Sequence, residues 1–98
     1  MWRVVDLAVL IYTVCGAGIG TSVILKSNVD KVLERLGIEA TVKAVGISEA
    51  SQASSPAQLI LATHEITDEL VGSRSEVVAV QSIFDLAELE QKLTAAIG

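Results

Sequence analysis

Residues 7–22 read Leu-Ala-Val-Leu-Ile-Tyr-Thr-Val-Cys-Gly-Ala-Gly-Ile-Gly-Thr-Ser, an apolar run that passes into a glycine-rich loop. The run Leu7–Val14 is apolar without regular alternation, which is typical of a strand that is covered on both faces in a parallel sheet. Beyond the loop, apolar residues recur at spacings of three and four as far as Leu36, and Gly37 supplies a left-handed stop. The sequence therefore predicts that the fold begins with a strand, a tight glycine loop and a helix.

The rest of the chain alternates between short strands and helices. We expect further strands at Ala40–Val45, Leu59–Ala62 and Val77–Val80. Between them, Gly46–Gln58 should hold at most a short helix and a loop, and Glu65–Val71 a short helix closed by Gly72. A last helix is expected from Asp85, with the apolar stripe Leu86, Leu89, Leu93 and Ile97. Asp85 and Glu88 resemble a capping box at the start of that last helix. The alternation predicts a three-layer α/β/α fold of flavodoxin-like or Rossmann-like type, with a four-stranded parallel sheet in the order 2-1-3-4.

Length and charge exclude several classes of protein. The chain has 98 residues, and we expect residues 1–98 to form a single domain. Seven basic and twelve acidic residues give a formal net charge of −5, which argues against nucleic-acid binding. Cys15 is the only cysteine and His64 the only histidine, so the sequence predicts no internal disulfide and no structural metal site.

The N-terminal residues also bear on where the protein works. An apolar run before Cys15 resembles a bacterial lipoprotein signal, but Asp6 interrupts it, and Tyr12-Thr13-Val14 lacks the small residue that cleavage requires. The apolar stretch Leu7–Gly20 is also shorter than the ~20 residues of a membrane-spanning helix. We therefore expect a buried strand in a cytoplasmic protein that does not insert directly into a membrane.

The predicted strand order brings two loops together. The chain reverses direction between the first and third strands, where a ligand crevice opens at the carboxyl ends of the strands. The loops at this point are Cys15–Ser22 and Thr63-His64-Glu65, so the single cysteine and the single histidine meet there. Closely spaced glycines before a helix turn backbone N–H groups inward and form an anion site, here suited to a phosphoryl group. The candidate phosphate-binding residues are Gly16, Ala17, Gly18, Ile19, Gly20, Thr21 and Ser22, with the hydroxyl groups of Ser22 and Thr21 as added donors.

Cys15 is the candidate catalytic residue. A helix N-terminus lowers the pKa of a thiol, commonly to about 3.5–7.5, so we expect a thiolate at neutral pH that attacks phosphorus. The alternative is a buried cysteine that only packs, since free cysteine is among the most buried residue types.

Other phosphate-binding loops differ from this one in spacing. The loop is one residue short of G-x-G-x-x-G, and no acidic residue closes the second strand, which disfavours dinucleotide binding. Thr21 follows Gly20 where a nucleotide hydrolase has lysine. The length fits the C-x₅-R-S/T loop of cysteine phosphatases, but Thr21 stands at the arginine position and cannot clamp phosphoryl oxygens. We therefore expect poor hydrolysis and a phosphocysteine that persists until transfer.

Three segments together resemble enzyme IIB of the bacterial phosphotransferase system (PTS), namely Val14–Ser22, the following helix with Lys26 and Val29-Asp30, and Ala62-Thr63-His64-Glu65-Ile66. The similarity runs from the first strand to the last helix and is greatest to the ascorbate-type branch, with the lactose, cellobiose and galactitol types more distant. It implies that Cys15 accepts a phosphoryl group from a phosphohistidine of enzyme IIA. Cys15 would then pass it to a carbohydrate, ascorbate by branch resemblance alone, that is held by the membrane permease enzyme IIC. No metal, nucleotide or other cofactor is implied. Met1–Asp6 and Ser48–Ser55 depart from the pattern of the branch.

Some interpretations stay open at this point. Thr63 and His64 are possible accessory residues: His64 either orients Thr63 or donates to the phosphoryl group, or it is an ordinary structural histidine. The alternative functions are a cysteine-loop phosphatase or arsenate-reductase-like enzyme, and an enzyme-IIB-like regulatory module. The missing arginine and the absence of resolving thiols count against the phosphatase and the reductase. The transported sugar and the oligomeric state do not follow from the sequence.

Overall fold

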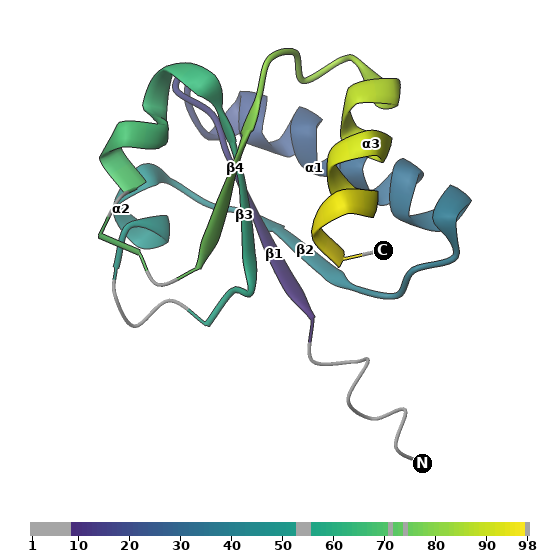
Figure 1. The fold of residues 1–98 in the computed structure, drawn as a ribbon. Coiled ribbons are helices and arrows are strands. Elements are labelled where there is room, and N and C mark those ends of the chain that lie inside the picture. Colours follow the sequence, from purple (N-terminus) through teal and green to yellow (C-terminus); the bar gives the residue numbers. More distant parts are fainter. Residues whose placement is uncertain (1–8, 53–55, 71, 74, 98) are drawn as a thin grey trace.

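The computed structural model describes residues 9–52, 56–70, 72, 73 and 75–97. Its elements are β1 (Leu10–Val14), α1 (Ile19–Leu36), β2 (Thr41–Ala44), α2 (Ile47–Ala50), β3 (Leu59–Thr63), the 3₁₀ helix η2 (His64–Leu70), β4 (Glu76–Val80) and α3 (Leu86–Ile97), as Figure 1 shows. The predicted element order is therefore confirmed. Leu7 and Ala8, expected in the first strand, lie outside the described residues, as does Val71. The helix expected at Glu65–Val71 is a 3₁₀ helix that begins one residue earlier.

The strands form one parallel sheet in the order β2-β1-β3-β4, which confirms the predicted order 2-1-3-4. The central strands β1 and β3 pair with Tyr12 opposite Ile60 and Val14 opposite Ala62. Their carboxyl ends therefore stop side by side. Cys15 and Thr63 stand at these two strand ends, where the sequence predicted a ligand crevice.

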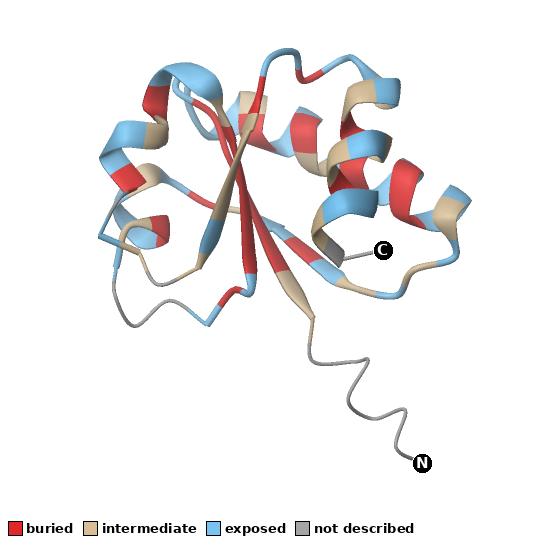
Figure 2. Cartoon of the chain, in the orientation of Figure 1, coloured by how far each residue is buried: buried red, intermediate tan, exposed pale blue. Residues whose placement is uncertain are grey.

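Helices cover both faces of this sheet, which confirms the three-layer arrangement (Figure 1). Successive side chains of a strand point to opposite faces, so Ile11 packs toward α1 and α3 while Tyr12 packs toward α2 and η2. On β3, Leu61 and Ile60 divide in the same way. Figure 2 shows burial running along both central strands, with exposed residues on the outer faces of the helices. The two halves of the core thus share one sheet, whose central strands carry the site.

α1 leads from the glycine loop across one face of the sheet. Its buried side chains Leu25, Val29, Val32 and Leu33 follow the predicted helical spacing. The helix ends at Gly37 with φ +71°, where the N–H of Ile38 donates to Leu33 O at 3.0 Å. This is the predicted left-handed stop, and it turns the chain back toward β2.

The start of α3 departs in part from the expected capping box. Asp85 Oδ1 accepts the Glu88 N–H at 3.1 Å, as a helix cap does. The Glu88 carboxylate does not return the bond to Asp85 but accepts the N–H groups of Gln81 at 2.7 Å and Ser82 at 3.0 Å, just after β4. Glu88 thereby fastens α3 to the end of β4.

Candidate functional site

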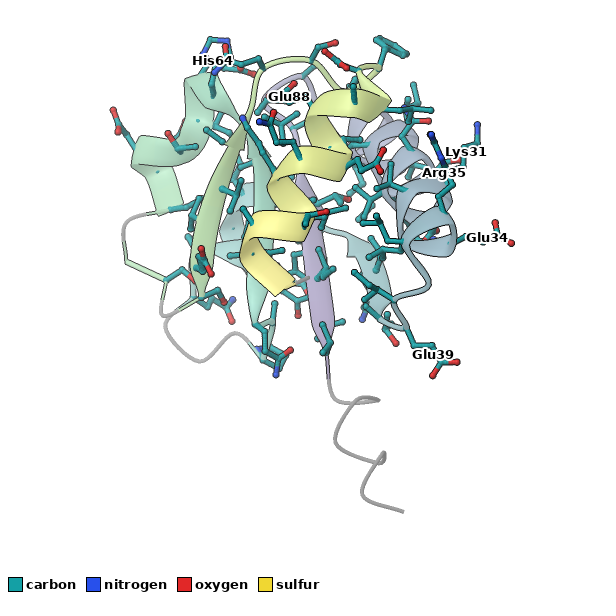
Figure 3. All side chains as sticks on the ribbon, turned by 45° about the vertical axis from the view of Figure 1, so that its right-hand side comes forward. Lys31, Glu34, Arg35, Glu39, His64 and Glu88 are labelled. Carbon is teal, nitrogen blue, oxygen red and sulfur yellow. The ribbon has the colours of Figure 1, made fainter. Side chains whose placement is uncertain are left out.

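The glycine loop and the β3–η2 junction meet at the carboxyl ends of β1 and β3. The Gly16 N–H donates to Thr63 Oγ1 at 3.0 Å, a contact that spans 47 residues of sequence. His64 lies at the same end of the sheet, as Figure 3 shows, and it is exposed. The predicted meeting of the two loops is therefore observed.

The loop makes a tight turn before the helix begins. The Gly18 N–H donates to Cys15 O at 3.2 Å, and the Ser22 N–H donates to Gly18 O at the same distance. Gly18, the residue before α1, has φ +125° and ψ 176°, a backbone conformation open essentially to glycine alone. Residues 16–20 are all exposed, so this turn presents its backbone to solvent.

Two buried hydroxyl groups hold the base of the loop. Ser22 Oγ accepts the Cys15 N–H at 2.9 Å, and Thr13 Oγ1 donates to Ser22 O at 3.0 Å. Ser22 thus ties the helix to the end of β1, and its predicted role as a donor to a phosphoryl group stays a prediction. Thr13 was not a candidate from sequence. Its signal is a hydroxyl-bearing residue within an otherwise apolar strand, two positions before the cysteine.

The first turn of α1 supplies donors for an anion. The N–H groups of Ile19, Gly20 and Thr21 have no acceptor within the helix, because the first intrahelical bond is the one that Ser22 makes. Gly18 has no side chain to cap them, and no acidic residue lies in this first turn. Within α1 itself, nothing therefore compensates the partial positive charge at the helix N-terminus, as the predicted phosphate-binding site requires.

The Cys15 thiol is buried beneath this loop. The residue is 4% exposed and packs in the half of the core that lies under α1 and α3. Burial raises the pKa of the thiol, a hydrogen bond from Ser22 lowers it, and the negative charge of Glu65 raises it again, so that the net pKa lies above 9.0. The expectation of a lowered pKa was therefore wrong, because desolvation and the nearby Glu65 carboxylate together outweigh the hydrogen bond from Ser22. The raised pKa favours the protonated thiol of Cys15 over the thiolate.

The Glu65 carboxylate lies against the loop, and the sequence did not single it out. A Cβ built on Gly16 would lie 2.7 Å from Glu65 Oε2 and 2.9 Å from Ile66 Cγ2. Hydrogen bonds, chiefly from the Thr63 hydroxyl, lower the pKa of Glu65. His64 Nε2 lies 3.9 Å from Glu65 Oε1. The signal available in the sequence was the position of Glu65 directly after the Thr-His pair.

Apolar side chains are exposed beside the loop. Ile19 and Val23 lie one helical turn apart at the start of α1 and are 55% and 51% exposed, and Ile24 is 43% exposed. Phe84, at 70%, is exposed in the β4–α3 loop, and Asn28 Nδ2 on α1 donates to the neighbouring Ile83 O at 2.7 Å. Ile19 and Val23 thus give the glycine loop an apolar border, and Phe84 is exposed in the segment that contacts the middle of α1.

Within the described ranges, no group of three or more His, Cys, Asp or Glu side chains is placed to hold a metal ion. None of the described helices has the length and apolar character required to cross a membrane.

The chain matches known proteins over most of its length. A family model described as "PTS system, Lactose/Cellobiose specific IIB subunit" matches residues 10–95. The ascorbate-specific PTS system EIIB component of Escherichia coli O157:H7 is 34% identical over 92 residues, which cover 93% of this chain and 91% of that protein. The corresponding component of Mycoplasma pneumoniae is 29% identical over 85 residues, covering 86% and 90%. The fold is similar to that of the lactose-specific IIB component domain of Streptococcus pneumoniae, with a TM-score of 0.61 at 12% identity over 92% of this chain and 98% of that one. The chain therefore belongs to the IIB subunit family of the sugar phosphotransferase system.

Proposed function

We propose that this IIB component carries a phosphoryl group on Cys15 between a phosphohistidine of enzyme IIA and a carbohydrate bound by the permease enzyme IIC. The observation that carries the proposal is the position of the only cysteine directly beneath a glycine loop whose helix N-terminus is uncapped. Ascorbate is the proposed carbohydrate, because the curated relatives from E. coli and M. pneumoniae are named ascorbate-specific.

The first transfer moves the phosphoryl group from nitrogen to sulfur. The P–N bond of the phosphohistidine breaks, the S–P bond to Cys15 forms, and the thiol proton ends on the imidazole nitrogen that leaves. Because the pKa of Cys15 is raised, this proton is still on the sulfur at neutral pH and is available to the leaving group. Backbone N–H groups of the loop and of the first turn of α1 stabilise the negative oxygens.

The second transfer reverses these roles at sulfur. The S–P bond breaks, an O–P bond forms to a carbohydrate hydroxyl, and the hydroxyl proton returns to sulfur. Thr21 at the arginine position of a phosphatase loop leaves no bidentate cation to assist water attack. Slow hydrolysis suits a carrier whose phosphoryl group must survive until the acceptor docks.

Both partners must cover the buried thiol, and the surface around it suits transient docking. The exposed apolar side chains Ile19 and Val23, at the start of α1, border the loop. We propose that enzyme IIA and enzyme IIC contact this border in turn while Cys15 turns outward. Since both exchanges take place on the inner side of the membrane in this scheme, the protein works in the cytoplasm.

Intact-mass spectrometry after incubation with phosphoenolpyruvate, enzyme I, the histidine phosphocarrier protein and a cognate enzyme IIA tests the proposal. Wild-type protein should gain the mass of one phosphoryl group, and the Cys15→Ser variant, verified as folded by circular dichroism, should gain none. Equal labelling of the Cys15→Ser variant, or no labelling of the wild type in an active relay, contradicts the carrier assignment. Turnover of an aryl phosphate instead would identify a cysteine-loop phosphatase.

A further inference from the structure

The Glu65 carboxylate lies against the first residue of the glycine loop, although the proposed transfer makes no use of it. The 2.7 Å separation between its Oε2 and a Cβ built on Gly16 is too short for any side chain at position 16 unless the carboxylate moves. Glycine at position 16 is therefore what admits a negative charge this close to the loop.

Glu65 draws on the donors that an anion at this place requires. The Thr63 hydroxyl, and to a smaller extent the N–H groups of Glu65 and Gly16, lower the pKa of the Glu65 carboxyl, although desolvation opposes them. The Gly16 N–H itself donates to Thr63 Oγ1 at 3.0 Å. Gly16 directly follows Cys15, so a phosphoryl group on Cys15 would need the same N–H group.

Little positive charge offsets this carboxylate. His64, at 3.9 Å, is the basic group within ion-pair distance of Glu65 in the described part of the chain. The other charged side chains on the surrounding helices are spread along their length: Lys26, Asp30, Lys31, Glu34 and Arg35 on α1, Glu49 on α2, Asp68 and Glu69 on η2, and Glu88, Glu90 and Lys92 on α3. Lys26 pairs with Asp30, Lys92 with Glu88, and Arg35 with Glu90. A phosphoryl group, which carries about −1.5 to −2 at neutral pH, therefore arrives beside an existing negative charge.

We propose that Glu65 is a positioning residue of the phosphoryl relay, whose carboxylate stands against Gly16 at the start of the glycine loop until a phosphoryl group on Cys15 displaces it. Glu65 is exposed, so its side chain can swing into solvent when the phosphoryl group arrives. Its charge favours the protonated thiol before transfer and repels the phosphoryl group afterwards. The repulsion makes onward transfer more favourable and returns Glu65 to the loop. This proposal rests on Cys15 being the phosphoryl acceptor.

The test compares wild type with Glu65→Gln and uses Glu69→Gln as the matched control, since Glu69 is an exposed carboxylate on the same 3₁₀ helix. The rate at which iodoacetamide alkylates Cys15 is measured as a function of pH. The midpoint of this curve reports the pKa of the thiol, and its plateau at high pH reports how accessible the sulfur is. The lowest concentration of inorganic phosphate that protects Cys15 from alkylation is measured in parallel.

For Glu65→Gln we expect a lower midpoint that makes alkylation at pH 7 about three- to tenfold faster, which corresponds to roughly half to one pKa unit. The phosphate concentration that gives half-protection should fall by a similar factor, because the neutral amide no longer competes as an anion. Glu65→Ala should change both quantities in the same direction, and Glu69→Gln should match the wild type.

An unchanged midpoint and unchanged phosphate protection in both Glu65 variants would overturn the proposal. An equal shift in Glu69→Gln would also overturn it, because the effect would then be a general one of net charge. Neither measurement uses enzyme IIA. A negative result in the relay experiment with a positive result here would therefore reject the carrier function while leaving the competition between Glu65 and anions established.

Discussion

Gly16 and Gly20 look alike in the sequence, but the structure gives them different surroundings. A Cβ at Gly16 would collide with Glu65 Oε2 at 2.7 Å and Ile66 Cγ2 at 2.9 Å, whereas a Cβ at Gly20 would meet nothing within 4 Å. The exposed Glu65 carboxylate can move away, but Ile66 is buried in the core beneath η2.

We therefore expect Gly16→Ala to lower the free energy of unfolding by about 1–3 kcal/mol, as overpacking against a fixed side chain does. Gly20→Ala should leave it unchanged or raise it by up to about 1 kcal/mol, because alanine favours the helix. Urea unfolding followed by circular dichroism measures both. Equal stability of the two variants would show that the loop does not depend on the close approach of η2.

The sequence predicted those features of the site that depend on the order of residues along the chain. It predicted correctly that the loop after Cys15 meets the segment that begins at Thr63. The thiol pKa was predicted in the wrong direction, because it depends on burial under the loop and on Glu65, which are tertiary features. Glu65 itself was missed for the same reason.

At the scale of elements, Glu88 joins two of them. Its carboxylate accepts hydrogen bonds from the N–H groups of Gln81 and Ser82 after β4. Within α3 it forms an ion pair with Lys92 at 2.7 Å. Burial favours the neutral form of Glu88, but these hydrogen bonds outweigh it and lower the pKa below the ordinary 4.5. A lowered carboxyl pKa stabilises the fold above about pH 4.5, and that contribution is lost as pH falls through the folded-state value.

Glu88→Gln should accordingly lower the free energy of unfolding at pH 7 by about 1.5–3 kcal/mol, the range for hydrogen bonds to charged groups. The difference from wild type should shrink between about pH 5 and pH 3, where the wild-type carboxylate becomes protonated. Urea unfolding at a series of pH values checks this. The control is Glu90→Gln, because Glu90 makes an exposed ion pair with Arg35 at 3.9 Å and should have little effect. A difference that does not depend on pH would rule out the carboxylate as the cause.

The elements themselves were largely predictable, because apolar periodicity and glycine stops are local signals. What periodicity did not reveal was the type of the short helix after β3, a 3₁₀ helix from His64 to Leu70. Only Ile66 and Leu70 are buried there, and a spacing of four residues does not separate the two helix types over so short a segment. The actual partners of Glu88 were also beyond the sequence, because they require β4 and α3 to be placed in space.

For the whole molecule, the two halves of the core share the strand β3. Leu61 is fully buried in the half under α1 and α3, and Ile60 is fully buried in the half under α2 and η2. Because neighbouring residues of one strand serve both halves, we expect Leu61→Ala and Ile60→Ala each to lower the free energy of unfolding by about 2–5 kcal/mol.

Each variant should still unfold in one transition, with methyl NMR signals from both halves disappearing at the same urea concentration. Loss of signals from one half before the other would show that the two faces of the sheet are independently stable. The parallel order of the sheet was predictable from the alternation of strands and helices. The expected joint unfolding of the two halves follows from that order, because both halves pack on the same central strands.

The contact between Gly16 and Thr63 also has a consequence during synthesis. Gly16 is synthesised 47 residues before Thr63, so Cys15 leaves the ribosomal exit tunnel well before the segment with Thr63 and Glu65 that completes its surroundings. Until β3 docks beside β1, Cys15 has neither its burial nor the nearby Glu65, and it reacts as an ordinary solvent-exposed thiol. A nascent or truncated chain that ends before Leu59 therefore carries the cysteine without the site, and is open to oxidation where the finished protein is shielded.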